Sequence, residues 1–252
     1  MRAVMLAAGV GARLGASQGG RPKVLLRFGG RTLLARHLAI LGHLGVEELV
    51  LALGYRAAEV EAELEAELEA LAPAMAVRTV YNPDYREGSI VSLWCLREAL
   101  KRGGEVMLMD ADVLYDHRLV ARLRAAPEAN CLAMDRDFEP GDEPVKICLR
   151  QGRLVDFHKR PRAHHEVSGE WVGFVRLSSS GARALVAAVE AYIAAGWRHA
   201  VYEEAIRETI LGAPEAFGVA DITGLPWIEI DFAEDVTRAR HKILPRLEEP
   251  GP

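Results

Sequence analysis

The stretch from Leu6 to Leu26, LAAGVGARLGASQGGRPKVLL, constrains this chain most, because it joins an apolar strand to a loop almost without side-chain bulk. The strand is predicted over residues 2–6. Alanine and glycine leave the backbone of the loop open, so that successive N–H groups can face phosphate oxygens. An arginine and, after a proline, a lysine supply countercharge. We therefore predict a nucleoside triphosphate site built from Leu6, Ala7, Ala8, Gly9, Gly11, Arg13 and Lys23.

Two other glycine motifs bind phosphates, and the sequence departs from both. A P-loop requires Gly-Lys-Ser or Gly-Lys-Thr, whereas Gly20 is followed by Arg21 and Pro22. A dinucleotide fingerprint requires a third glycine where Leu14 stands, and an acid after the second strand, which ends at Leu53 instead. A tight turn alone would explain the glycines but not the two cations.

The order of predicted elements indicates the fold class. Strands predicted at 2–6, 48–53, 76–81 and 105–109 alternate with helices that start near Thr32, Ala57 and Ser89. Such alternation is typical of a parallel sheet with helices on both faces. Strands at 130–134, 145–149, 154–158 and 170–176 then follow with polar turns, which predicts a β-rich insertion. Helices at 181–194 and 201–211, short strands at 217–221 and 227–230, and a helix at 233–244 complete the pattern.

We therefore expect an α/β chain with a Rossmann-like mixed sheet, mostly parallel, in one domain over residues 1–247. A nucleotide-binding half would span 1–115, an acceptor-binding half 116–247, and a disordered tail 248–252. Two small domains are the alternative at this length.

Composition narrows the partners. The chain has 252 residues, of which 50% are hydrophobic, and a formal net charge of −5, which favours a small-molecule partner over nucleic acid or an anionic membrane. The three cysteines form no CxxC motif, so neither a disulfide framework nor a zinc site is indicated. No apolar run is long enough to span a membrane, and we expect a cytoplasmic protein without a signal peptide.

Acidic residues follow two predicted strands. Asp110 and Asp112 come after the strand at 105–109, and Asp231 comes after the strand at 227–230. The carboxyl ends of the strands are where such sheets bind ligands, so these acids would lie beside the phosphate loop. Carboxylates near a triphosphate are unfavourable unless a divalent cation separates them, which Mg²⁺ does with carboxylate and phosphate oxygens. Taken singly, each acid could instead cap a helix.

A third segment, YNPDYREGSIVSL, starts at a strand end and enters a helix. Asn82, Ser89 and the N–H groups of this helix could bind a pyrimidine edge or a phosphate, and Ser92 could contact an acceptor. A simple helix cap at Gly88 or Ser89 would also explain the segment.

Four segments in order resemble the nucleotidyltransferase superfamily, and the phosphocholine cytidylyltransferase type most closely: LAAGVGARL with PKVLL, YNPDYREGSIVSL, MDADV and WIEIDFAED. The resemblance implies a GT-A-like fold and transfer of a nucleotide from CTP to a small phosphorylated alcohol, with release of pyrophosphate. It implies that Asp112 and Asp231 bind Mg²⁺ directly, and that Asp110 lies next to these ligands without binding the ion itself. Gly88 departs from the bulkier polar residue that relatives often carry.

In the reaction that this resemblance implies, an acceptor phosphate oxygen attacks the α-phosphorus. Lys23, Arg13 and Asp112 then act as catalytic groups by alignment and charge neutralisation. An acceptor with its own phosphate requires a second cation, for which we favour Lys146 over Lys159. Aromatic rings and acids could hold an ammonium group. The predicted acceptor site is Ser92, Lys146, Trp171 and Glu203, with Trp94, Tyr115, Tyr202, Trp227, Glu170 and Glu204 as further candidates.

Several alternatives remain open from the sequence. The acceptor could be a sugar phosphate, an inositol phosphate or an aminoalkylphosphonate, and the chain could be a homodimer. A non-catalytic regulatory module that keeps the nucleotide fold is the alternative from another class, which loss of Lys23 or the acids would have favoured.

Overall fold

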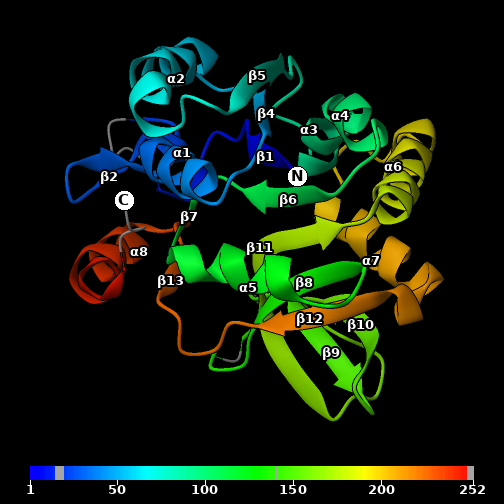
Figure 1. Cartoon of the computed structure of the whole chain (residues 1–252). Helices are drawn as coiled ribbons and strands as arrows, with labels where there is room; N and C mark the ends of the chain where they lie inside the picture. The colour runs from blue at the N-terminus through cyan, green and yellow to red at the C-terminus, as the bar shows by residue number, and fades with distance from the viewer. Residues whose placement is uncertain (15–19, 140, 249–252) are drawn as a thin grey trace.

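Four parallel strands form the N-terminal part of the central sheet in the computed structural model, which describes residues 1–14, 20–139 and 141–248 (Figure 1). β1 (Arg2–Ala7) lies between β4 (Glu48–Leu53) and β6 (Val106–Asp110), and β5 (Ala76–Tyr81) pairs with β4. The carboxyl ends of β1 and β6 therefore lie side by side, with Leu6 opposite Asp110. This register brings the glycine-rich loop to the predicted acids.

Helices cover both faces of this sheet, as predicted. Along β1 the side chains alternate, so Ala3 and Met5 join one hydrophobic cluster while Val4 joins another. The first cluster includes α1 (Leu33–His43), α2 (Ala57–Leu71) and α5 (His117–Ala125). The second includes α3 (Ser89–Cys95), α4 (Arg97–Lys101), α6 (Ser179–Ala194) and α7 (Tyr202–Gly212).

The predicted β-rich insertion is mostly antiparallel, apart from the parallel pair of β12 and β8, and centres on β11 (Val167–Leu177), a strand of 11 residues. Its C-terminal part pairs with β6, and its flanks pair with β8 (Asn130–Asp135) and β9 (Lys146–Arg150). β10 (Arg153–His158) and β12 (Phe217–Asp221) extend this region. Because β11 hydrogen-bonds directly to β6, the two halves share one sheet and form a single α/β fold.

Short elements frame the site and depart from the predicted pattern. β13 (Trp227–Glu229) pairs with β7 (Val113–Tyr115) in a small separate sheet. β2 (Arg27–Phe28) and β3 (Arg31–Thr32) form a hairpin. The helix predicted at 233–244 divides into α8 (Ala233–Arg238), a π-helical turn (Ala239–Ile243) and a 3₁₀ turn (Leu244–Arg246). A third hydrophobic cluster joins these pieces, with Phe28, Leu114, Ile228 and Val236 at its centre.

Near the end of the described chain, Glu248 is held against α5. Its backbone N–H donates to Asp116 at 2.9 Å, and its carboxylate pairs with Arg118 at 2.6 Å. The rest of the tail predicted to be disordered, residues 249–252, lies outside the described residues. None of the described helices is both long and apolar enough to cross a membrane.

Candidate active site

The glycine-rich loop and Lys23 form one pocket at the carboxyl ends of β1 and β6. Gly11 has a φ of +65°, which side chains rarely tolerate, and a Cβ there would lie 3.1 Å from Lys23 Cγ. Glycine at this position therefore lets the lysine side chain cross the loop. The pocket has a volume of about 90 Å³ and is lined by Leu6, Ala7, Gly9, Gly11, Lys23, Val24, Ala111 and Asp112.

Lys23 joins the acids of two separate strand ends. Its ammonium donates to Asp112 Oδ2 at 2.8 Å and to Asp231 Oδ1 at 2.5 Å. Burial alone would lower the pKa of Lys23, but the two carboxylates outweigh burial and raise this pKa above its ordinary value. The lysine is therefore positively charged throughout the neutral range. Lys23 and Asp112 thus point into the same pocket, as a single nucleotide site requires.

Three carboxylates gather around this lysine. Asp112, Glu229 and Asp231 offer oxygens that all lie within 4.8 Å of one another. Crowding of the Glu229 carboxyl by the surrounding protein, together with the charges of Asp112 and Asp231, raises the pKa of Glu229 well above its ordinary value, although the residue stays partly exposed to solvent. An all-oxygen cluster of this size is the donor set that Mg²⁺ prefers, and a divalent cation would relieve the repulsion among its members. The residues present therefore fit the predicted ion.

Asp110 points away from this cluster, toward α7. Tyr202 Oη donates to Asp110 Oδ2 at 2.6 Å, and burial together with the charge of Asp112 raises the pKa of Asp110. Gly173 on β11 has a φ of +87°, and a Cβ there would come within 2.7 Å of the same carboxylate oxygen. Asp110 is therefore fixed by α7 and β11, which both belong to the half of the chain that the sequence predicts to bind the acceptor.

A buried histidine supports the backbone between the two aspartates. One ring nitrogen of His37 lies 2.9 Å from the carbonyl oxygen of Ala111, and the other lies 3.3 Å from the hydroxyl of Tyr115. Burial lowers the pKa of His37 to about 4, so the ring is neutral at neutral pH. His37 was not among the predicted site residues, because a single histidine within an apolar helix forms no recognisable binding motif.

A chain of ion pairs connects the nucleotide pocket to the insertion. Arg13 lies 3.3 Å from Asp231 and 3.3 Å from Glu143, and Glu143 Oε2 also lies 3.3 Å from Lys159 Nζ. Arg13 and Lys159 are half exposed, so a bound phosphate could replace their carboxylate partners at little cost. Both cations are therefore available to anionic ligands.

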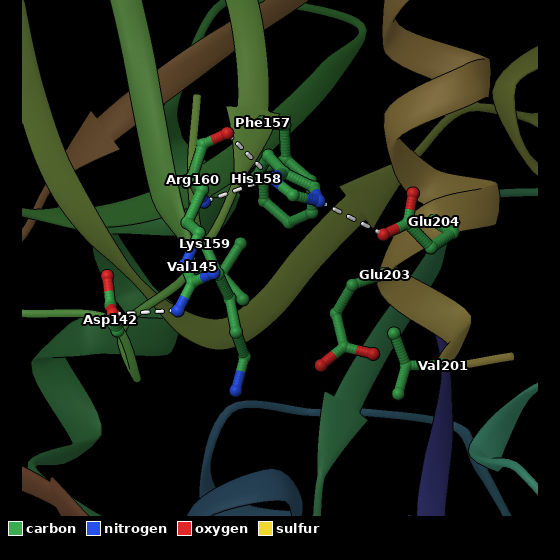
Figure 2. A pocket seen from close by; sticks show the side chains of 9 residues that line it. All are labelled: Asp142, Val145, Phe157, His158, Lys159, Arg160, Val201, Glu203 and Glu204. Carbon is green, nitrogen blue, oxygen red and sulfur yellow. Dashed lines mark hydrogen bonds and ion pairs between the residues drawn. The ribbon is translucent and has the colours of Figure 1, made fainter. Parts of the chain in front are cut away.

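A second cavity lies between β10 and the N-terminal turn of α7 (Figure 2). Its volume is about 220 Å³. Lys159 and Glu203 extend into the same opening in Figure 2, while Glu204 pairs with His158 at 3.3 Å. The lining combines cations, carboxylates and apolar side chains: Asp142, Val145, Phe157, His158, Lys159, Arg160, Val201, Glu203 and Glu204.

Several predicted binding residues instead hold elements together. Asn82 is buried and donates to Ser92 Oγ at 3.0 Å, and Ser89 Oγ accepts from the backbone N–H of Tyr202 at 2.9 Å. Ala8 is buried, and its carbonyl accepts from the N–H of Tyr55. None of these four residues lines either cavity. Their predicted ligand contacts stay predictions.

Close packing at Gly88 explains why this position holds glycine in place of the bulkier polar residue expected from the family resemblance. A Cβ at this position would lie 2.1 Å from the carbonyl oxygen of Ala200, and the N–H of Gly88 donates to the carbonyl of Arg198 at 2.8 Å. The start of α3 therefore packs directly on the loop that leads into α7.

Two further residues of the predicted acceptor site, Lys146 and Trp171, do not line the second cavity. The Lys146 ammonium donates to the carbonyl oxygens of Gly141 and Lys159, both at 2.6 Å, and to that of Pro144 at 3.3 Å. Trp171 is buried, with its indole N–H donating to the carbonyl of Phe174. Lys146 thus positions the backbone that carries Lys159, and Glu203 alone of the predicted acceptor set lines the cavity.

Some site residues that were not predicted nevertheless have a recognisable spacing in the sequence. Glu229 and Asp231 are two positions apart around the end of a strand, where alternation places side chains on one face. That spacing could have added Glu229 to the metal cluster. The contact between Tyr202 and Asp110 had no such signal, since 92 positions separate them.

Comparisons with known proteins identify the family and the fold of the chain. The family model described as "MobA-like NTP transferase domain" matches residues 3–205. The chain is 31% identical over 255 residues to CMP-5'-(3-aminopropyl)phosphonate synthase of Streptomyces rubellomurinus, covering 99% of this chain and 40% of that protein. The chain spans between 40% and 52% of the length of this protein and of two other curated relatives that it matches.

Two solved structures share the fold at low identity. The inositol-1-phosphate CTP transferase of T. maritima has a TM-score of 0.73 at 19% identity and covers 97% of this chain and 95% of its own. The CTP:phosphocholine cytidylyltransferase of Streptococcus pneumoniae has a TM-score of 0.73 at 17% identity, and the match covers 95% of this chain and 97% of the other. These similarities confirm the predicted nucleotidyltransferase fold.

Proposed function

Because the chain belongs to the MobA-like NTP transferase domain family, we propose that it is a cytidylyltransferase that joins CMP to a small phosphorylated or phosphonylated acceptor. The observation that carries this proposal is the Lys23 ammonium, held between Asp112 and Asp231 at the open glycine-rich loop. A cation, a cluster of carboxylates and an unobstructed backbone at one sheet edge suit a nucleoside triphosphate and its divalent ion. Similarity to a CMP-phosphonate synthase supports CTP as the donor.

Asp112, Glu229 and Asp231 would hold Mg²⁺, which neutralises phosphate charge when bound. With these carboxylates bound to the ion, the Lys23 ammonium would be free to donate hydrogen bonds to the phosphoryl group that is transferred. Arg13 lies at the outer edge of the pocket, where it can hold the departing pyrophosphate. The attacking phosphate or phosphonate oxygen is already ionised at neutral pH, so alignment and charge neutralisation carry the reaction without a protein nucleophile.

The acceptor half would bind the second substrate in the cavity between β10 and α7. Lys159 supports this placement, because its ammonium is joined through Glu143 to Arg13 at the nucleotide pocket. Phosphocholine, aminoalkylphosphonates and inositol phosphate all belong to the class of acceptors that this arrangement can serve. The sugar phosphates are larger members of the same class.

A pyrophosphate-release panel tests the proposal. Four nucleoside triphosphates are crossed with phosphocholine, phosphoethanolamine, 2-aminoethylphosphonate, inositol phosphate and hexose phosphates, in the presence of Mg²⁺. We expect release with CTP and at least one small acceptor, and loss of release on addition of EDTA. Release with another nucleoside triphosphate would show that this nucleotide, and not CTP, is the donor. No release with any pair would favour a non-catalytic regulatory module.

A further inference from the structure

The cavity between β10 and α7 carries opposite charges within one small space. Lys159 and Glu203 both line it, and Figure 2 shows their charged ends extending into the same opening. Burial raises the pKa of Glu203, and the positive charge of Lys159 opposes this rise, which places the two groups within electrostatic reach. A ligand that is anionic at one end and cationic at the other would complement both groups.

Glu203 differs from the other acids of this cavity in having one buried carboxylate oxygen without a hydrogen-bond donor in the described part of the chain. Its Oε2 atom is buried and accepts no hydrogen bond from any described residue. Glu204 is paired with His158 at 3.3 Å, and Asp142 is paired with Arg160 at 2.8 Å. A buried carboxylate oxygen without a donor is unfavourable, so such atoms are uncommon unless a ligand supplies the missing hydrogen bond.

We infer that Glu203 accepts hydrogen bonds from the primary ammonium group of a zwitterionic acceptor, and that Lys159 binds the phosphate or phosphonate at the other end of that molecule. This inference rests on the proposed function, whose acceptor class it narrows. The charges of Asp112 and Asp110 act on Glu203 electrostatically, so an acceptor bound at Glu203 would lie close enough to the nucleotide pocket for its phosphate or phosphonate end to react there. A short acceptor, with two or three carbons between its charged ends, fits a cavity of about 220 Å³.

A quaternary ammonium such as choline fits this cavity less well. It has no N–H to donate to Glu203, and proteins usually hold it against aromatic faces. Among the described residues that line the cavity, Phe157 is the one aromatic residue, and it is only 1% exposed. Trp171 and Tyr202 pack behind it, with Trp171 5.2 Å from the Phe157 ring and 5.7 Å from the Tyr202 ring. These rings therefore belong to the core and form no cage.

Matched acceptors test the inference directly. Phosphoethanolamine, phosphocholine and ethyl phosphate differ only at the ammonium end, and 2-aminoethylphosphonate with ethylphosphonate repeats the comparison for phosphonates. Binding is measured by calorimetry on the wild-type chain with Mg²⁺ and CMP, and turnover by pyrophosphate release with CTP. We expect at least tenfold tighter binding of each primary amine than of its uncharged and quaternary partners, which corresponds to about 1.4 kcal/mol.

The variant Glu203→Gln should reduce this preference to near one, while Glu204→Gln, on the same cavity, should keep it. Selective binding without pyrophosphate release would support the amine site and overturn the proposed reaction. Release with equal preference for phosphocholine or ethyl phosphate would support the reaction and overturn the amine site. An unchanged preference in Glu203→Gln would also overturn it, since the ammonium would then bind elsewhere.

Discussion

The two cavities, which we propose bind two anionic substrates, hold their charged groups in different ways. In the nucleotide pocket the lysine is already bonded to two carboxylates that follow strands of two different sheets, so the charges are fixed before any ligand arrives. In the acceptor cavity Lys159 is half exposed and Glu203 has an oxygen without a donor. On the proposed function, the first site would carry the nucleotide transfer itself, whereas the second would be completed by the acceptor. We therefore expect substrate specificity to depend on the second cavity.

The largest expected effect is loss of the fixed charges. Lys23→Ala or Asp112→Asn should lower turnover by about a hundredfold or more, the scale of removing one preorganised charge-stabilising group. Pyrophosphate release under saturating substrates measures this effect. Lys101→Ala is the matched control, because Lys101 pairs with Glu190 on the surface at 2.6 Å. Near-normal turnover in Lys23→Ala would show that the charges of the first pocket do not drive the reaction.

A smaller effect is expected from closing the open backbone. A Cβ added at Gly9 would meet nothing within 4 Å, and φ at this residue is not in the left-handed region, so Gly9→Ala should fold normally. If phosphates approach the loop closely, the added methyl group should raise KM for CTP by about tenfold, or about 1.4 kcal/mol.

Gly212→Ala provides the matched control for this loop, since a Cβ there also meets nothing within 4 Å. It should leave both Tm and KM unchanged. Equal KM values for Gly9→Ala and the wild-type chain would place the phosphates elsewhere.

The difference between the cavities also explains how much the sequence could predict. The loop, Lys23 and Asp112 come from segments with local patterns: an apolar strand, small residues and acids at a strand end. Parallel strands then bring those ends together, as β1 and β6 do. The acceptor cavity has no such pattern, because β10 meets α7 only through tertiary packing. The sequence favoured Lys146 over Lys159, but the structure uses the Lys146 ammonium for backbone contacts and places Lys159 in the cavity lining.

The link between the two cavities can be tested at Tyr202. Tyr202→Phe removes the hydrogen bond to Asp110 and leaves a partly buried carboxyl without its donor, which should cost about 1–3 kcal/mol of stability. Because Asp110 lies two residues before Asp112, we also expect a severalfold fall in kcat with little change in KM for CTP. Thermal unfolding and steady-state kinetics measure the two effects. A purely structural hydroxyl would lower Tm and leave kcat unchanged.

The smallest expected effect concerns the acids that hold each half together. Asp156 on β10 accepts from Arg207 of α7 at 2.8 Å and from the N–H of Arg162, also at 2.8 Å, and so joins the two walls of the acceptor cavity. Burial alone would raise the pKa of Asp156, but these donors outweigh burial and lower the pKa to about 2. A carboxyl with a folded pKa below its unfolded pKa stabilises the fold above about pH 4, and this contribution is lost as pH falls toward 2.

Asp156→Asn should therefore lower the free energy of unfolding by about 1–2 kcal/mol at pH 7, with the difference from the wild-type chain shrinking between about pH 4 and pH 2. Denaturant unfolding across that range measures it. Glu48 is the matched residue of the nucleotide half: it pairs with Arg2, Arg78 and Arg102, and its pKa is also lowered to about 2. Both variants should lose stability, but only Asp156→Asn should raise KM for the acceptor, because only Asp156 joins the walls of that cavity. A rise in acceptor KM in Glu48→Gln of the same size would mean that the two halves respond as one unit.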